Sequence, residues 1–425
     1  MIIIIIGLLL ILMALLGAPL FIIIAAIALL SFYSLGIDTS TVILSINQLT
    51  SAPTLLAIPL FTFAGYILAE SNTPKRLVNL SKALFGWLPG GLAIVALVTC
   101  AFFTAFTGAS GVTIVALGGL LYPVLRKEGY PEKFSLGLLT SSGSLGLLFP
   151  PSLPIILYAL VAKISVDQLF LAGIVPGLLL IILLSLFSIN KGTTAKVPTI
   201  PFNWKNLFSA FKDAAWEIPL PFIIIGGIYG GIFTATEAAA VTAFYVLIIE
   251  VFIYRDLNLF KDVPKIMRES MLLVGGILVI LGTAMGLTNY LIDEQIPMKI
   301  LDFMRTFISS KIVFLMMLNI LLLIVGCMMD MFSAIIVVVP LIVPIAEEFG
   351  VDPVHLGVIF LANLEIGYFT PPVGLNLFIS SFRFKKPVLT LYLSALPFLV
   401  ILIIALLIIT YVPELSLWLV RLVGN

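Results

Sequence analysis

Apolar runs long enough to cross a bilayer recur from one end of this 425-residue chain to the other. A helix needs about 20 mostly apolar residues to span roughly 30 Å of hydrocarbon. Only 10% of the residues are charged and 61% are hydrophobic, whereas a soluble globular protein carries roughly 25% charged residues on its wetted surface. The sequence therefore predicts an all-α polytopic membrane protein without a soluble domain of any size.

Four of the apolar runs are short and form two pairs with brief links. Runs 89–106 and 110–125 are joined by Thr107–Gly111, and runs 311–326 and 331–346 are joined by Met328–Asp330. Two short helices with so brief a link predict a re-entrant hairpin, which enters the membrane and returns to the same side. An amphipathic stretch precedes each pair, at 71–88 and more weakly at 298–307. Such stretches are expected to lie along the membrane interface.

Two longer runs, 134–162 and 354–382, are each interrupted by a proline pair, Pro150-Pro151 and Pro371-Pro372. A proline pair removes two amide donors and blocks carbonyls one turn earlier, so each helix is expected to unwind there. Unwound backbone at membrane depth is tolerated only inside protein or beside a water-filled cavity. The two interruptions therefore predict a polar site within the membrane.

These features recur with one offset along the chain. Five glycines and prolines of the first half have counterparts 221 residues later: Pro123, Gly129, Gly146, Pro150 and Pro151 match Pro344, Gly350, Gly367, Pro371 and Pro372. The order of amphipathic stretch, hairpin and interrupted helix also occurs twice. The pattern predicts an internal structural repeat.

The positive charges indicate how the two repeats are oriented. If each hairpin returns to its own side, 17 of the 22 Lys and Arg residues fall on one face, in the loops 71–88, 126–133, 190–217, 255–269 and 383–387. Positive-inside bias makes that face cytoplasmic. Full crossings by both hairpins would scatter the basic loops over both faces. The repeats are therefore expected to have inverted topology.

An inverted pair of hairpins and unwound helices is typical of secondary transporters, in which exposed carbonyls and hydroxyls bind a coupling cation near the midplane. Sodium prefers hard oxygen ligands. The freed helix N-termini would favour an organic anion. For any single hydroxyl the alternative is helix packing, which small residues also serve in membranes. Oxygen-bearing residues gather at these positions: Thr107, Gly108, Ser110, Thr113, Ser141, Ser142 and Ser144 in the first half, and Asp330, Ser333, Asn363 and Thr370 in the second.

Carboxylates at membrane depth are costly and are usually paired or functional. Asp330 is either a cation ligand or a helix cap at the hairpin tip, and Glu365 is protonated, paired or facing a cavity. Glu237, in T-x-x-E before an apolar run, is expected to form a capping box. The single histidine, His355, has no second histidine with which to bind a metal. Cys100 and Cys327 lie in apolar runs and are interpreted as buried thiols.

The chain lacks the residues that a membrane enzyme would need. It has one histidine, no H-E-x-x-H motif and no G-x-S-x-G motif. A scaffold without transport activity, the other alternative, would not need two unwound helices. We therefore expect no enzyme activity and no cofactor, with sodium ions as the only bound metal.

Two stretches, Gly226–Ala240 (GGIYGGIFTATEAAA) and Thr370–Phe378 (TPPVGLNLF), resemble the large membrane subunit of tripartite ATP-independent periplasmic (TRAP) transporters. The resemblance covers essentially the whole chain. It implies membership of the ion transporter superfamily, sodium-driven uptake and an elevator mechanism in the bacterial inner membrane. It also implies an organic acid delivered by a periplasmic binding protein, with overall likeness favouring sialic acid over C4-dicarboxylates.

The resemblance further implies a small four-helix membrane subunit. The repeat begins near residue 50 with one apolar run before it, so that subunit is expected to be a separate chain, and no nucleic acid partner is expected. The family's sodium positions correspond to Ser110 and Ser141–Gly143 in one half. In the other they correspond to Asp330, Ser333, Asn363 and Thr370, although the tip Met328–Phe332 is bulkier than the hydroxyl-rich tips of the family.

The features above and the family resemblance predict a set of site residues and a division of the chain into segments. The expected sodium ligands are Thr107, Gly108, Ser110, Ser141, Ser142, Gly143, Asp330, Ser333, Asn363, Gly367 and Thr370, and the expected substrate contacts are Ser144, Pro150, Pro151, Glu365, Pro371 and Pro372. The expected segments are N-terminal scaffold helices 1–70, arm helix 71–88, first transport repeat 89–165, scaffold helices 166–290, second arm 291–310, second transport repeat 311–386 and C-terminal helix 387–425.

Overall fold

A computed structural model describes residues 9–10, 12–13, 18–50, 53–199, 201–305, 308 and 310–423. Every regular element within these ranges is helical, so the all-α prediction is confirmed. Six described helices are long and apolar enough to cross a membrane, or up to eight if each of two bent helix pairs counts as one span. The start of the first apolar run, its break at Gly17 and the end of the second arm segment at 306, 307 and 309 lie outside the described residues.

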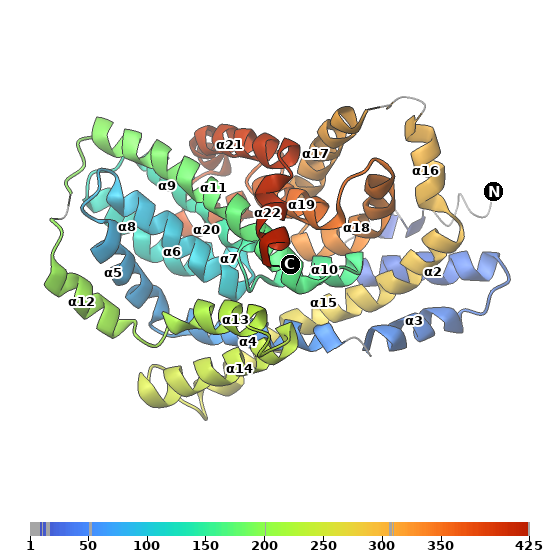
Figure 1. Ribbon diagram of the computed structural model, residues 1–425, viewed down its shortest axis with the longest axis horizontal. Coiled ribbons are helices and arrows are strands. Elements are labelled where there is room, and N and C mark those ends of the chain that lie inside the picture. The colour runs from blue at the N-terminus through green and yellow to red at the C-terminus, as the bar shows by residue number, and fades with distance from the viewer. Residues whose placement is uncertain are drawn as a thin grey trace.

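The helices follow one another with short connections (Figure 1). In chain order they are α2 (Leu20–Ser34), α3 (Ser40–Thr50), α4 (Ala57–Glu70), α5 (Thr73–Phe85), α6 (Gly91–Thr107), α7 (Ser110–Thr113), α8 (Gly119–Lys127), α9 (Glu132–Ser142), α10 (Leu153–Ala162), α11 (Val166–Thr194), α12 (Trp204–Asp213), α13 (Pro219–Tyr229), α14 (Ala235–Ile248), α15 (Asp262–Asp293), α16 (Ile296–Arg305), α17 (Lys311–Met328), α18 (Met331–Glu348), α19 (Pro353–Gly367), α20 (Leu375–Phe384), α21 (Val388–Tyr411) and α22 (Glu414–Val423).

The two halves repeat at the level of the backbone. The broken helix α9–α10 corresponds to α19–α20, and the bonds Pro150–Pro151 and Pro371–Pro372 are both cis. Gly129 and Gly350, which precede the two broken helices, both have positive φ, at 90° and 71°. Lys163 and Lys385 end α10 and α20 in the same left-handed conformation, with φ of 57° and 52°. Local geometry thus follows the predicted 221-residue offset at the glycines and proline pairs, and follows it to within one residue at the two lysines.

The two hairpins enter the molecule from opposite ends (Figure 1). One consists of α6, α7 and α8, and its base lies at the end of the molecule that also holds α5 and α12. The other consists of α17 and α18, and its base lies at the end that holds α16. Length alone would let α17 and α18 each cross a membrane. Their equivalence to the first hairpin and the distribution of basic loops instead place their common tip inside.

Two sharp bends match the sequence predictions. The chain turns by 74° between α4 and α5, so α5 leaves the direction of the spanning helix, as expected of an interfacial arm. It turns by 47° between the α9 segment and α10, at the first proline pair. The capping box of Thr234 and Glu237 at the start of α14 is also present.

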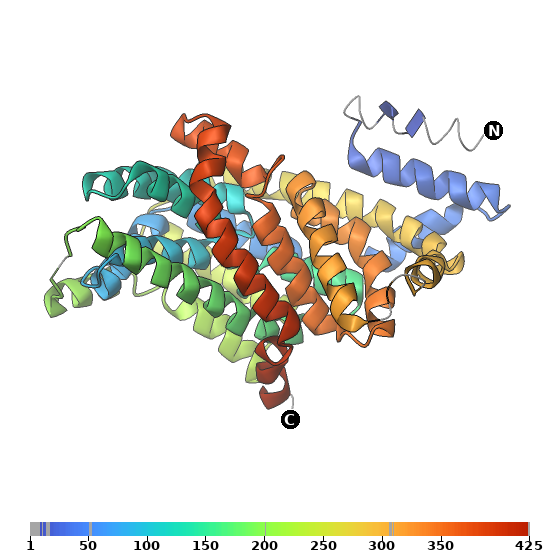
Figure 2. The same cartoon turned by 90° about the horizontal axis from the view of Figure 1, so that it is seen from above.

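Helix packing divides the described elements into two groups. The helices α4, α13, α14 and α15 pack together with α2 and α3. The helices α11 and α21 pack instead with the hairpins and broken helices, α11 against α6 and α19, and α21 against α9 and α19. Figure 2 shows α21, in red, running alongside α19. The expected scaffold segment 166–290 is therefore split, because its first helix, α11, packs with the two repeats.

A charged cluster holds the arm α5 against the first group. The guanidinium of Arg76 contacts carboxylates of Glu217, of Glu250 at 2.9 Å and of Asp256 at 2.7 Å. It also lies 3.8 Å from the centre of the Tyr254 ring. Burial alone would raise the pKa of Asp256, but hydrogen bonds from Asn72 and Arg76 outweigh it and lower that pKa. The Arg76 cluster anchors the arm at its N-terminal end.

Glycines let hairpin and broken helix approach closely in both halves. The Cα of Gly146 faces the carbonyl oxygen of Ala101 on α6, and a Cβ there would clash with it. In the second half a Cβ on Gly367 would lie 2.6 Å from the carbonyl carbon of Gly326 on α17. Both positions therefore require glycine for backbone contact rather than for an unusual φ.

We predict that Gly367→Ala destabilises the protein whereas Gly275→Ala does not. The new methyl group at position 367 must displace backbone, and overpacking of this kind costs about 1–3 kcal/mol. Gly275 lies exposed within α15, and a Cβ there would meet nothing within 4 Å. Thermal unfolding of the two purified variants in the same detergent compares them. Equal unfolding temperatures would contradict the close packing of α17 on α19.

We also predict that the faces carrying Lys261 and Lys299 lie on opposite sides of the membrane. Both lysines are exposed, and the two native cysteines are buried. In cells whose outer membrane has been removed, a membrane-impermeant maleimide should label Lys299→Cys and leave Lys261→Cys unlabelled until the cells are lysed. Wild-type protein should remain unlabelled throughout. Labelling of both variants from outside would overturn the assigned orientation.

Candidate functional site

The first hairpin tip is tied to the first break by hydroxyl groups. Gly108, in a left-handed conformation with φ of 63°, ends α6 and turns the chain towards α7. The hydroxyls of Thr104 and Thr113 lie 2.6 Å apart across the hairpin. Thr104 also donates to the carbonyl oxygen of Gly143 at 2.9 Å. The hairpin therefore supplies a donor to backbone that the unwinding of α9 leaves unpaired.

Ser110 connects the first hairpin to the second half of the chain. Its hydroxyl donates to the side-chain oxygen of Asn376 on α20 at 2.7 Å. The amide of Asn376 donates to the carbonyl oxygen of Thr140 at 3.4 Å, and Thr140 donates to Ser380 at 2.9 Å. Sequence reasoning did not select Asn376 or Ser380. The position of Asn376 within the TPPVGLNLF motif was the available signal.

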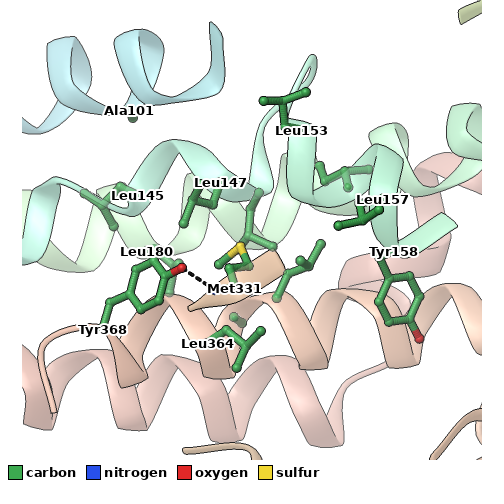
Figure 3. Close-up of a cluster of buried hydrophobic side chains, with 14 of the residues drawn as sticks. Ala101, Leu145, Leu147, Leu153, Leu157, Tyr158, Leu180, Met331, Leu364 and Tyr368 are labelled. Atoms are coloured by element: carbon green, nitrogen blue, oxygen red, sulfur yellow. Dashed lines mark hydrogen bonds between the residues drawn. The ribbon is translucent and has the colours of Figure 1, made fainter. Parts of the chain in front are cut away.

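The second hairpin tip is organised by a helix cap. Asp330 is the N-cap of α18, and its carboxylate accepts the backbone amide of Ser333 at 3.0 Å and the Ser333 hydroxyl at 2.5 Å. The phenol oxygen of Tyr368 accepts the backbone amide of Met331 at 2.6 Å (Figure 3). Of the two alternatives for Asp330, the capping geometry is therefore present.

Asn363 belongs to a buried polar chain that runs away from the tip. Its amide donates to the side-chain oxygen of Asn319 on α17 at 2.7 Å. The amide of Asn319 donates to the hydroxyl of Thr410 on α21 at 3.1 Å. His355 lies beyond, with its ring nitrogens 3.1 Å from the Ser416 hydroxyl and 3.2 Å from the Thr410 carbonyl oxygen. These contacts join α17, α19, α21 and α22 and give His355 a packing role.

The two broken helices meet at equivalent residues. The hydroxyl of Ser144 donates to the backbone oxygen of Glu365 at 3.1 Å, and the two residues are 221 positions apart. Contact between residues related by the repeat marks the axis about which the halves are related. Two of the residues expected from the sequence to contact substrate, Ser144 and Glu365, therefore lie where the two halves join.

Several buried oxygens near the breaks have no hydrogen-bond partner within the described part of the chain. They are the hydroxyls of Thr107 and Ser152, the side-chain oxygen of Asn363 and both carboxyl oxygens of Glu365. Buried polar atoms in native proteins are normally satisfied, so such a set indicates groups that bind water, protons or ions. Hard oxygen donors of this kind fit sodium better than a soft or nitrogen-preferring metal.

The other expected site residues divide by their contacts and exposure. Ser141, Ser142 and Thr370 direct their hydroxyls to carbonyls of their own helical segments, as in ordinary helix packing. The first proline pair is buried, whereas Pro371 and Pro372 are exposed. The two equivalent breaks therefore differ in access to the surroundings.

Comparison with known proteins covers most of the chain. Residues 6–415 match the family model described as "Tripartite ATP-independent periplasmic transporter, DctM component". The C4-dicarboxylate TRAP transporter large permease protein DctM of Pseudomonas aeruginosa is 40% identical over 365 residues, covering 86% of this chain and 85% of that protein. The ectoine TRAP transporter large permease protein TeaC of Halomonas elongata is 31% identical over 409 residues, covering 95% and 96%.

Among solved structures, the YdaH transporter of Alcanivorax borkumensis has a similar fold. The TM-score is 0.64 at 14% sequence identity, with 90% of this chain and 88% of that chain covered. A likeness at this identity concerns the fold alone. Taken with the inverted repeat, the paired hairpins and the matched family model, it leads to one conclusion: the chain belongs to the DctM-component family of tripartite ATP-independent periplasmic transporters, as a multi-pass large permease rather than an enzyme.

Proposed function

We propose that this permease imports a small organic anion across the bacterial inner membrane, driven by sodium. The observation that carries the proposal is the junction at Ser144 and Glu365, where the two broken helices of an inverted repeat meet beside buried oxygens without partners. Inverted repeats with discontinuous helices are the usual construction of secondary transporters.

The proposed sodium sites lie between each hairpin tip and the neighbouring break. In the first half the oxygens available are those of Thr107 and Ser110 with the backbone at Ser141–Gly143. In the second they are those of Asp330, Asn363 and the backbone near Gly367. Bound sodium would supply positive charge beside the substrate, which lowers the cost of holding an anion at membrane depth.

The proposed movement is a displacement of one packed group against the other. The hairpins, the broken helices, α11 and α21 would move together, while the group formed by α4, α13, α14 and α15 with α2 and α3 would stay fixed. The arms α5 and α16 would connect them. This grouping supports the elevator mechanism implied by the family resemblance, because contacts within each group are more extensive than those between the groups.

The proposed partners are a separate small membrane subunit and a periplasmic binding protein, as the tripartite family description implies. For the substrate, we favour a C4-dicarboxylate over sialic acid, because the relative at 40% identity is named for C4-dicarboxylates. The ectoine relative shows that permeases of this family are also named for a substrate of a different chemical class. The binding protein would therefore select the substrate first.

We predict that uptake depends on a sodium gradient. The permease, reconstituted in vesicles with its small subunit and loaded binding protein, should accumulate succinate when sodium is higher outside, and should not do so when potassium replaces sodium. A proton gradient applied without sodium should give no accumulation. Equal uptake under the proton gradient alone would reject sodium coupling.

We predict that Asp330→Asn raises the sodium concentration needed for half-maximal uptake by about tenfold or more. Asparagine caps helices about as well as aspartate, so the hairpin tip should still fold. A hydrogen bond to a charged group contributes roughly 1.5–3 kcal/mol. Losing the negative charge of Asp330 beside sodium should cost a similar free energy of sodium binding.

Asp352→Asn is the matched control, because Asp352 caps α19 by the same chemistry on the surface. Its sodium dependence should equal that of the wild type. An unchanged sodium dependence in Asp330→Asn would leave Asp330 with the capping role alone.

A further inference from the structure

The helix α12 carries an exposed aromatic stripe that the proposed transport site does not use. Trp204, Phe208 and Phe211 are 75%, 76% and 40% exposed. Their spacing of four and three residues places them on one face of the helix. Three large aromatic side chains on the outer face of a surface helix need an apolar environment, because exposing them to water is unfavourable.

The opposite face of α12 is polar and faces a groove. Asn206 and Asp213 of α12 line a cavity of about 280 Å³ against the arm α5, which contributes Asn79 and Lys82. Between these faces, Ala210 is buried and α12 packs on α5. The helix is thus amphipathic, with its apolar side directed away from the protein and its polar side towards a water-accessible groove.

The surroundings of α12 identify what covers the aromatic stripe. The helix lies between the ends of α11 and α13, at the end of the molecule where the basic loops gather (Figure 1). Lys205 and Lys212 are exposed and sit beside the stripe, seven residues apart. A helix with aromatic residues on one face and lysines along its edge binds in the plane of a membrane that contains anionic lipids.

We propose that α12 is an interfacial helix that binds anionic phospholipid of the cytoplasmic leaflet. The aromatic stripe lies at the boundary of headgroups and acyl chains, and Lys205 and Lys212 bind lipid phosphates. The neighbouring helix α11 is long and apolar enough to cross the bilayer, and α13 is a shorter apolar helix, so the surface beside α12 is in contact with lipid and lipid is the occupant that fits.

The position of α12 links this lipid contact to the arm. The helix packs along α5, and Glu217, four residues after its end, contacts Arg76 of the arm. Lipid bound to α12 therefore fixes the position of the helix against which the arm α5 packs.

The lipid contact can be measured without any transport assay. The permease is placed in phosphatidylcholine vesicles containing 30% phosphatidylglycerol with brominated acyl chains, and quenching of tryptophan fluorescence is recorded. Trp204→Phe should remove a large part of the quenched signal, and Trp418→Phe, at the C-terminal helix α22, serves as the matched control. Absence of any Trp204 contribution, or its loss when the small membrane subunit is added, would overturn the proposal and assign the stripe to water or to that subunit.

The charge contribution is tested in the same vesicles. Lys205→Gln with Lys212→Gln should weaken the apparent affinity for phosphatidylglycerol about fivefold for each lysine removed. Lys127→Gln with Lys261→Gln, on other loops of the same face, should leave the Trp204 signal unchanged. If both double variants weakened the apparent affinity for phosphatidylglycerol equally, general surface charge would explain the binding, and a specific site on α12 would be rejected.

Discussion

Polar backbone in the middle of a membrane must find its partners within the protein, and this requirement organises the two repeats. Each proline pair leaves backbone polar groups without a partner inside their own helix. Thr104 of the first hairpin donates to the carbonyl oxygen of Gly143 beside the first break, and Tyr368 beside the second break accepts the backbone amide of Met331 at the second hairpin tip. The hairpins therefore have to pack against the breaks, and the glycines at 146 and 367 make that packing close enough.

The backbone features could be predicted from the sequence because they depend on local chemistry. Proline pairs break helices wherever they occur, and the 221-residue offset needed only glycines and prolines to be recognised. The side-chain contacts could not be predicted in this way. Ser110 and Asn376 are 266 residues apart, and nothing in either neighbourhood specifies the other. The helix α12 was expected as part of a basic loop, because ten residues of mixed polarity give a weak hydropathy signal.

The two halves share a backbone plan but not their side chains. Ser144 and Glu365 occupy equivalent positions in the two repeats. The hydroxyl of Ser144 donates a hydrogen bond to the Glu365 backbone, whereas the carboxyl oxygens of Glu365 have no partner in the described structure. The first proline pair is buried and the second is exposed. A pair of pseudo-symmetric sites can therefore have different ligands and different access, although the same fold builds both.

The Arg76 cluster also has a consequence for the order of assembly. Arg76 is synthesised early, and its partners follow 141 residues later at Glu217, 174 residues later at Glu250 and 180 residues later at Asp256. Translation proceeds from the N-terminus, so the first hairpin and broken helix emerge while Arg76 still lacks these carboxylate partners. The Arg76 cluster can be complete only after the chain has passed residue 256 of 425, so Arg76 lacks part of its set of carboxylate partners until about three-fifths of the protein has been made.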